Sequence, residues 1–189
     1  MKSDGIYGLV LAGGRSNRMG RDKGLIDFHG KPQRVHLFDL LNKFCAKVFV
    51  SCKKEQETPL HLNPIHDKFD FESPLNGILS AFDLHPKKAW LAVAVDMPFV
   101  DENALKFLIS NQDPKKMATC FYDSEGKLPE PLFTIWEPLA LNHLLRFRET
   151  GEISPRDFLS KNDVHLINIP DSRVLFNANT PDDLFFGQK

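Results

Sequence analysis

A glycine-rich and cation-rich stretch near the N-terminus, GLVLAGGRSNRMGRDKGL at residues 8–25, constrains the fold more than any other part of the chain. Its apolar start, residues 9–12, is typical of a buried strand. Two glycines and four cations follow at once: Gly13, Gly14, Arg15, Arg18, Arg21 and Lys23. Because glycine lets backbone N–H groups approach an anion and the cations neutralise its charge, we expect a phosphate-binding loop after this strand. The stretch contains neither the G-x-G-x-x-G fingerprint nor the G-K-[ST] ending of the P-loop.

The segments that follow predict a doubly wound sheet. Residues 32–46 carry apolar side chains at spacings of three and four, which predicts a helix beginning near Pro32, and residues 48–52 read as the next strand. The order of strand, phosphate loop, helix and strand is typical of the opening of such a sheet. Residues 90–95 form an unbroken apolar run, as expected for a central parallel strand.

The second half adds shorter strands and helices. Strands are expected at residues 117–121 and 132–136, with a half-buried edge strand at 164–169. Helices are expected at residues 78–84, 102–111 and 139–147, and a further helix begins at Ser154 and Pro155. We therefore predict a single Rossmann-like, three-layer α/β domain over residues 1–189, with a mostly parallel central sheet and at least one antiparallel strand from the second half.

Composition excludes several functional classes. A net charge of −1 and a pI near 6.7 speak against a nucleic-acid or membrane-surface protein, because these usually carry a broad basic surplus. Three scattered cysteines, Cys45, Cys52 and Cys120, suit the core of a cytoplasmic protein better than a disulfide framework. No signal peptide or membrane span is expected, and neither H-E-x-x-H nor G-x-S-x-G occurs. We thus expect a cytoplasmic protein without a zinc site or serine-hydrolase chemistry.

Asp96 and Lys23 are the strongest candidates for chemistry. Asp96 follows the apolar strand at residues 90–95, and ligands of open α/β sheets bind at the carboxyl ends of such strands. Its carboxylate suits Mg²⁺, a hard cation that prefers oxygen, although it could instead be a turn or helix-cap aspartate. Lys23 offers a mobile point charge that can reach a triphosphate from the end of the glycine loop; the alternative is a solvated surface lysine.

Weaker candidates lie in polar segments. Asp67 could bind a ligand or could simply be a solvated loop aspartate. Asn76 and Gly77 could bring the backbone close to a base or a ribose, but a turn before a helix explains them equally well. Asn177 and Asn179 offer amide groups to a polar ligand, or form a turn ahead of a capped helix.

Residues 11–23 resemble the signature L-A-G-G-x-S-x-R-M-G-x-D-K of nucleotidyltransferases in the molybdenum cofactor guanylyltransferase family, with every fixed position filled. The resemblance continues in order along nearly the whole chain, at Asp67 and at residues 74–77, 96–98, 131–132 and 177–184. One departure is Ser73, which stands where the first glycine of the family's G-P-L-x-G loop is usual. The missing glycine bears on the backbone conformation expected just before Pro74. A residue that precedes proline already favours extended conformations, however, and serine tolerates them.

The resemblance implies transfer of GMP from GTP to the terminal phosphate of molybdopterin or its molybdenum form, with release of pyrophosphate. It implies Mg²⁺ held by Asp96, catalysis by Arg18, Lys23 and Asp96, and an acceptor site at Asn177 and Asn179. The nucleotide would be bound by Leu11, Ala12, Gly13, Gly14, Lys23, Asp67, Gly77 and Asp96.

Two other functions stay open. In the first, the chain is a relative that uses another nucleotide or acceptor, such as a molybdopterin cytidylyltransferase. Those relatives carry L-A-A-G, however, and Gly13 favours guanine. A non-catalytic GTP-binding cofactor-delivery protein would have less need of both Lys23 and Asp96. The expected partners are GTP and molybdopterin, with other cofactor-biosynthesis proteins and molybdoenzyme chaperones as further candidates, and neither a nucleic acid nor a membrane.

Overall fold

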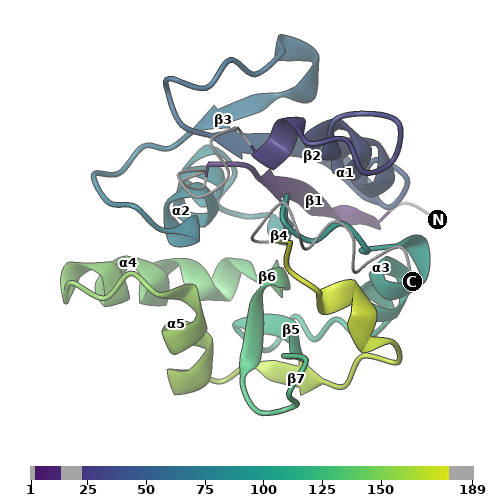
Figure 1. The fold of residues 1–189 in the computed structure, drawn as a ribbon. Coiled ribbons are helices and arrows are strands. Elements are labelled where there is room, and N and C mark those ends of the chain that lie inside the picture. The colour runs from purple at the N-terminus through teal and green to yellow at the C-terminus, as the bar shows by residue number, and fades with distance from the viewer. Residues whose placement is uncertain (1–2, 14–22, 179–189) are drawn as a thin grey trace.

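The computed structural model describes residues 3–13 and 23–178, which form a seven-stranded sheet between two layers of helices (Figure 1). The strands lie in the order β3-β2-β1-β4-β6-β5-β7. Their bounds are β1 Ser3–Leu11, β2 Cys45–Cys52, β3 Pro64–His66, β4 Ala89–Ala94, β5 Ala118–Tyr122, β6 Pro129–Trp136 and β7 His165–Ile167.

The helices cover both faces of this sheet. In Figure 1, α1 and α3 lie on one side of the strands, and α2, α4 and α5 lie on the other. Their bounds are α1 Gln33–Leu41, α2 Pro74–Leu84, α3 Glu102–Ser110, α4 Leu141–Glu149 and α5 Pro155–Lys161. Short 3-10 helices occur at Lys23–Leu25, Leu60–Leu62, Pro138–Ala140 and Ser172–Leu175.

Strand directions confirm the predicted fold class. β1 runs parallel to β2 and β4, and β3 runs parallel to β2. β6, from the second half, is antiparallel to both β4 and β5, while β7 is parallel to β5 at the edge of the sheet. As a consequence, the amino end of β6 lies at the same edge as the carboxyl ends of β1 to β4.

The core is built from the apolar runs in the sequence. All six residues of β4 are buried, which explains why this central strand shows no alternation of polar and apolar side chains. Trp90 of β4 lies opposite Trp136 of β6, and neither is exposed. The three cysteines are buried and free, as predicted, and burial raises the pKa of the Cys120 thiol to about 12. Within the described ranges, every helix is too short or too polar to cross a membrane.

Two helix boundaries differ from the sequence prediction by four residues or more, whereas those of α3 and α4 differ by one or two. α1 ends at Leu41, and a turn at residues 42–44 leads into β2, so the helix predicted to reach residue 46 is too long. The error arises because Phe44 and Cys45 are buried and continue the apolar pattern, although a turn and a strand carry them. α2 begins at Pro74 rather than at residue 78, so Asn76 and Gly77 belong to its first turn and not to a turn before it.

Ser73 shows how this chain accommodates the departure from the glycine that is usual before Pro74. Its backbone is extended, at φ −161° and ψ 154°, a conformation that any residue adopts. Its hydroxyl accepts a hydrogen bond from the Leu75 N–H at 3.2 Å and donates one to the Ile153 carbonyl at 2.5 Å. Serine therefore caps α2 here and ties it to the segment before α5.

Candidate functional site

A cavity of about 650 Å³ opens at the carboxyl ends of β1 to β4. Each strand delivers side chains or backbone to its wall: β1 leads into Ala12 and Gly13, β2 carries Ser51, β3 leads into Asp67, and β4 into Asp96. The first turn of α2 closes another part of the wall with Gly77. The cavity therefore occupies the place where ligands of open α/β sheets bind.

Most of the candidate nucleotide residues come together in this cavity. Its lining includes Leu11, Ala12, Gly13, Lys23, Asp67, Gly77 and Asp96. Gly14, Arg18 and Asn179 lie outside the described residues. Asn177 does not line the cavity, but the N–H of the next residue, Ala178, donates to the Asp96 carbonyl at 2.7 Å. Residue 178 is thus hydrogen-bonded to the backbone of Asp96.

Asp96 and Lys23 form an ion pair at the centre of the site. The Lys23 Nζ lies 3.6 Å from the Asp96 Oδ2 and donates to the Ala178 carbonyl at 3.3 Å. Only 19% of the Lys23 side chain and 20% of the Asp96 side chain are exposed. Burial raises the pKa of the Asp96 carboxyl, and the Lys23 charge partly opposes this rise. Lys23 is therefore not a solvated surface lysine.

The Asp96 carboxylate fits a hard divalent cation. Its Oδ1 is buried and accepts no hydrogen bond from any residue that the structure describes. Nowhere in residues 3–13 and 23–178 do three or more His, Cys, Asp or Glu side chains gather as a metal site. Mg²⁺ at nucleotide sites takes many of its ligands from phosphates and water, so a single carboxylate such as that of Asp96 suffices to hold it.

Asp67 is held against the glycine loop by β2 and β3. Its Oδ1 accepts a hydrogen bond from the Ser51 Oγ at 3.2 Å, and its N–H donates to the Cys52 carbonyl at 2.9 Å. Burial raises the pKa of its carboxyl. A Cβ on Gly13 would lie 2.9 Å from the Asp67 Oδ2, closer than real Cβ atoms approach such a group. A side chain at position 13 would thus force the Asp67 carboxylate or the loop to shift.

Gly77 is required by a second close contact. A Cβ at this position would lie 2.3 Å from the Ser51 Oγ and 3.0 Å from the Leu11 Cδ2. Sequence analysis missed Ser51, which lines the cavity between Asp67 and α2. The available signal was a hydroxyl within the otherwise apolar run at residues 48–52.

Sequence analysis also missed two charged residues beside the cavity. Glu130 lies near the start of β6 and is only 3% exposed, and its carboxylate contacts Arg156 of α5. The signal for Glu130 was a charged residue between Pro129 and Pro131 at the start of an apolar strand. Arg156 gave no signal beyond its position in the first turn of a predicted helix.

Comparison with known proteins places the chain among nucleotidyltransferases. Residues 8–166 match the family model described as the MobA-like NTP transferase domain. A molybdenum cofactor guanylyltransferase from Pseudomonas putida is 30% identical over 93% of this chain and 94% of its own length. A molybdenum cofactor biosynthesis bifunctional protein from Synechocystis sp. is 35% identical over 97% of this chain, but the chain spans only 53% of that relative's length.

Solved structures share the fold. Molybdopterin-guanine dinucleotide biosynthesis protein A from Archaeoglobus fulgidus is 23% identical and superposes with a TM-score of 0.79, covering 95% of each chain. The 2-C-methyl-D-erythritol 4-phosphate cytidylyltransferase from Thermus thermophilus is 14% identical, with a TM-score of 0.69 over 100% of this chain and 98% of its own. Because proteins named for different reactions share this fold, the fold alone does not select the substrate.

Proposed function

Because the chain belongs to the MobA-like NTP transferase domain family, we propose that it transfers GMP from GTP to the terminal phosphate of molybdopterin or its molybdenum form. The observation that carries the proposal is the cavity that brings Gly13, Lys23 and Asp96 together at the carboxyl ends of the strands. Similarity to guanylyltransferases over 93% of this chain supports this acceptor and this nucleotide. The proposal concerns only the part of the bifunctional relative that this chain matches, which is 53% of its length.

The reaction needs alignment and charge neutralisation more than acid–base chemistry. An oxygen of the acceptor phosphate forms a bond to the α-phosphorus of GTP, while the bond from that phosphorus to the β-phosphate oxygen breaks and pyrophosphate leaves with the electron pair. The attacking phosphate is already an anion, so no strong general base is required. In this scheme the Gly13 backbone and the Lys23 ammonium hold the phosphates, Asp67 assists at the nucleotide, and Asn177 faces the acceptor.

Nucleotidyltransferases of this family typically use a divalent metal. We assign Mg²⁺ to this chain, held by Asp96, because the buried Oδ1 has no hydrogen-bond donor among the described residues. When bound, Mg²⁺ supplies positive charge against the phosphate oxygens. Lys23, on the other side of the carboxylate, supplies a second positive charge.

The remaining assignments extend this proposal. Gly14 and Arg18 belong to the phosphate loop, and Asn179 joins Asn177 at the acceptor. Gly77 lies beside the nucleotide. The chain acts as a single nucleotidyltransferase domain over residues 1–189 in the cytoplasm. Other cofactor-biosynthesis proteins and molybdoenzyme chaperones are proposed partners for product transfer.

Pyrophosphate release tests the function directly. Purified protein is incubated with Mg²⁺, molybdopterin and each nucleoside triphosphate in turn, and we expect GTP to give the highest kcat/KM. A higher kcat/KM with CTP would instead assign the chain to the cytidylyltransferase relatives. Tight GTP binding without pyrophosphate release from any triphosphate would favour the delivery protein.

Gly13→Ala should lower the kcat/KM for GTP more than it lowers the stability of the fold. The added Cβ would lie 2.9 Å from the Asp67 Oδ2, so the carboxylate and the loop must move apart. A steric misfit of this kind typically costs about 1 to 3 kcal/mol, or roughly 10- to 200-fold in kcat/KM. Gly5→Ala is the matched control, because a Cβ at this β1 position meets nothing within 4 Å. Equal kcat/KM values for the two variants would contradict the role of the Gly13–Asp67 contact.

A further inference from the structure

β6 brings a second buried carboxylate to the edge where Asp96 lies. The antiparallel ladder pairs Trp90 with Trp136 and continues to the pair Val93 and Phe133. Beyond this last pair the two strands continue to the same edge of the sheet, β4 toward Asp96 and β6 back toward its start, where Glu130 lies. The Asp96 charge contributes to the raised pKa of Glu130, which agrees with this proximity, although burial is the larger cause.

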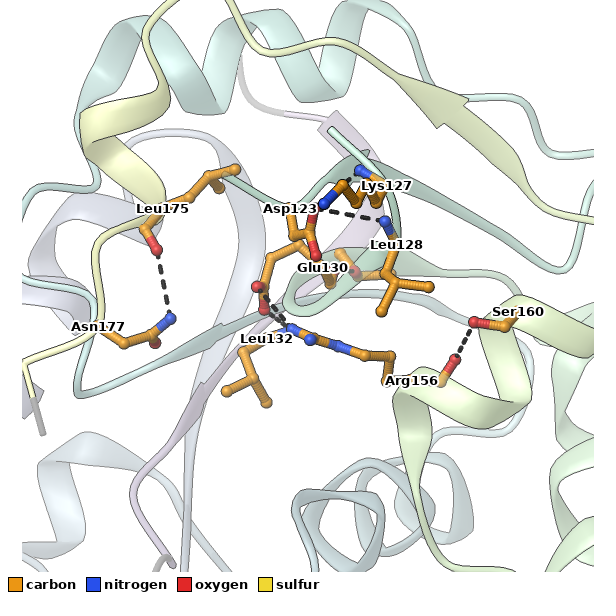
Figure 2. A network of polar contacts seen from close by, with 10 residues as sticks. Asp123, Lys127, Leu128, Glu130, Leu132, Arg156, Ser160, Leu175 and Asn177 are labelled. Atoms are coloured by element: carbon orange, nitrogen blue, oxygen red, sulfur yellow. Dashed lines mark hydrogen bonds and ion pairs between the residues drawn. The ribbon is translucent and has the colours of Figure 1, made fainter. Parts of the chain in front are cut away.

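The Glu130 carboxylate is fixed on one side and turned toward Arg156 on the other. Its Oε1 accepts a hydrogen bond from the Leu132 N–H at 2.8 Å. Its Oε2 lies 3.4 Å from Nη2 of Arg156, the second residue of α5. Figure 2 shows the Arg156 side chain extending from α5 toward this carboxylate, close to Leu132. Leu132 itself lines the cavity, and the Glu130 carboxylate joins its backbone N–H to Arg156, so the guanidinium lies behind this part of the cavity wall.

Most of the guanidinium remains available to a ligand. The Arg156 side chain is 40% exposed, whereas that of Glu130 is only 4% exposed. A guanidinium has five N–H donors, and within the described part of the chain the Arg156 side chain donates only through Nη2, to Glu130. Burying the Glu130 carboxylate costs folding free energy that one backbone hydrogen bond and one long ion pair offset only in part, so stability alone does not explain the arrangement.

The chemistry of the reaction indicates which anion Arg156 would bind. An acceptor phosphate that approaches Asp96 from the β6 side meets the negative charges of Asp96 and Glu130. Lys23 pairs with Asp96 and is assigned to the triphosphate of GTP. A second cation is needed on the acceptor side, and a planar guanidinium suits a phosphate because it donates two parallel hydrogen bonds.

We propose that Arg156 binds the phosphate of the acceptor and that Glu130 is the positioning residue that directs its guanidinium toward the Asp96 edge of the cavity. This inference rests on the proposed function. Glu130 acts only through Arg156, so its effect on the reaction should disappear once Arg156 is removed.

Steady-state kinetics with GTP, Mg²⁺ and molybdopterin test the assignment. Arg156→Ala should raise the KM for molybdopterin about 10- to 100-fold, the range for a charge-assisted hydrogen bond, and leave the KM for GTP within about twofold. Added guanidinium ion should partly restore the activity of Arg156→Ala. Glu130→Gln keeps the shape of the side chain and removes its charge, and should raise the KM for molybdopterin by a smaller factor.

A double variant keeps the test decisive if Arg156→Ala folds poorly because Glu130 loses its partner. Glu130→Gln with Arg156→Ala contains no lone buried charge, and it should match Arg156→Ala in the KM for molybdopterin. Arg173→Ala is the matched control, since Arg173 pairs with Asp171 on the surface, and both KM values should stay unchanged. An unchanged KM for molybdopterin in Arg156→Ala and in the double variant would overturn the inference.

Direct binding separates this inference from the proposed function. The Kd of molybdopterin is measured without GTP for the native protein and for both Arg156 variants. If the native protein released no pyrophosphate but lost molybdopterin affinity in Arg156→Ala, the proposed reaction would be wrong and the anion site would stand. If the native protein were active and its molybdopterin Kd did not depend on Arg156, the anion site alone would be wrong.

Discussion

Asp96→Asn is expected to lower turnover by roughly 10²- to 10³-fold, the scale of one removed electrostatic contact in an active site. Asparagine keeps the shape of the side chain but lacks the charge that holds a hard cation. Nucleotide should still bind weakly through the Gly13 loop. Pyrophosphate release as a function of Mg²⁺ concentration measures the loss, and nucleotide binding without acceptor shows what remains.

The same substitution should not destabilise the fold. Burial raises the pKa of Asp96, so the ionised carboxylate is less favourable in the folded chain than in water. Asparagine removes this cost but also removes the ion-pair partner of Lys23, which keeps its hydrogen bond to the Ala178 carbonyl, so we expect the Tm to change little. Asp67→Asn is the comparison and should cost less activity. Full Mg²⁺-dependent activity in Asp96→Asn would leave Asp67 as the better candidate for the metal ligand.

The parts of the fold that could be predicted are those with local signals. The unbroken apolar run at residues 90–95 predicted a central strand, and a strand buried on both faces produces such a run. The boundaries of α1 and α2 were less predictable, because apolar spacing continues through the turn after Leu41 and the cap of α2 is formed by the Ser73 hydroxyl. Helix ends depend on individual hydrogen bonds, which periodicity does not encode.

The residues of the candidate site also fall into those with a local sequence signal and those without one. Gly13, Lys23 and Asp96 follow a strand or a glycine loop, so their neighbours in sequence already indicate a role. Ser51 and Glu130 matter because distant segments meet: Ser51 contacts Asp67 of the loop after β3, and Glu130 lies at the same edge of the sheet as Asp96 because β6 is antiparallel to β4. Strand order and register are properties of the folded sheet, and no short motif specifies them.

Lys23→Ala is expected to raise the KM for GTP and lower kcat together, with a combined loss of about 10²-fold in kcat/KM. The ammonium would stabilise the triphosphate both in the bound substrate and in the transition state. The variant should also lose about 1 to 2 kcal/mol of unfolding free energy, because Lys23 is largely buried and hydrogen-bonded to the Ala178 carbonyl. Lys43→Ala is the control, since Lys43 pairs with Glu102 on the surface away from the cavity.

A pH profile distinguishes Lys23 as part of the site from Lys23 as a structural cation. The Lys23 charge lowers the pKa of Asp96, so its removal raises that pKa further. Asp96 must be ionised to hold a cation, and a higher pKa means that it ionises only at higher pH. The acid limb of the kcat/KM profile should therefore move to higher pH in Lys23→Ala, and Lys23→Arg, which keeps the charge, should move it less. Native kinetics and an unmoved acid limb in Lys23→Ala would return Lys23 to a purely structural role.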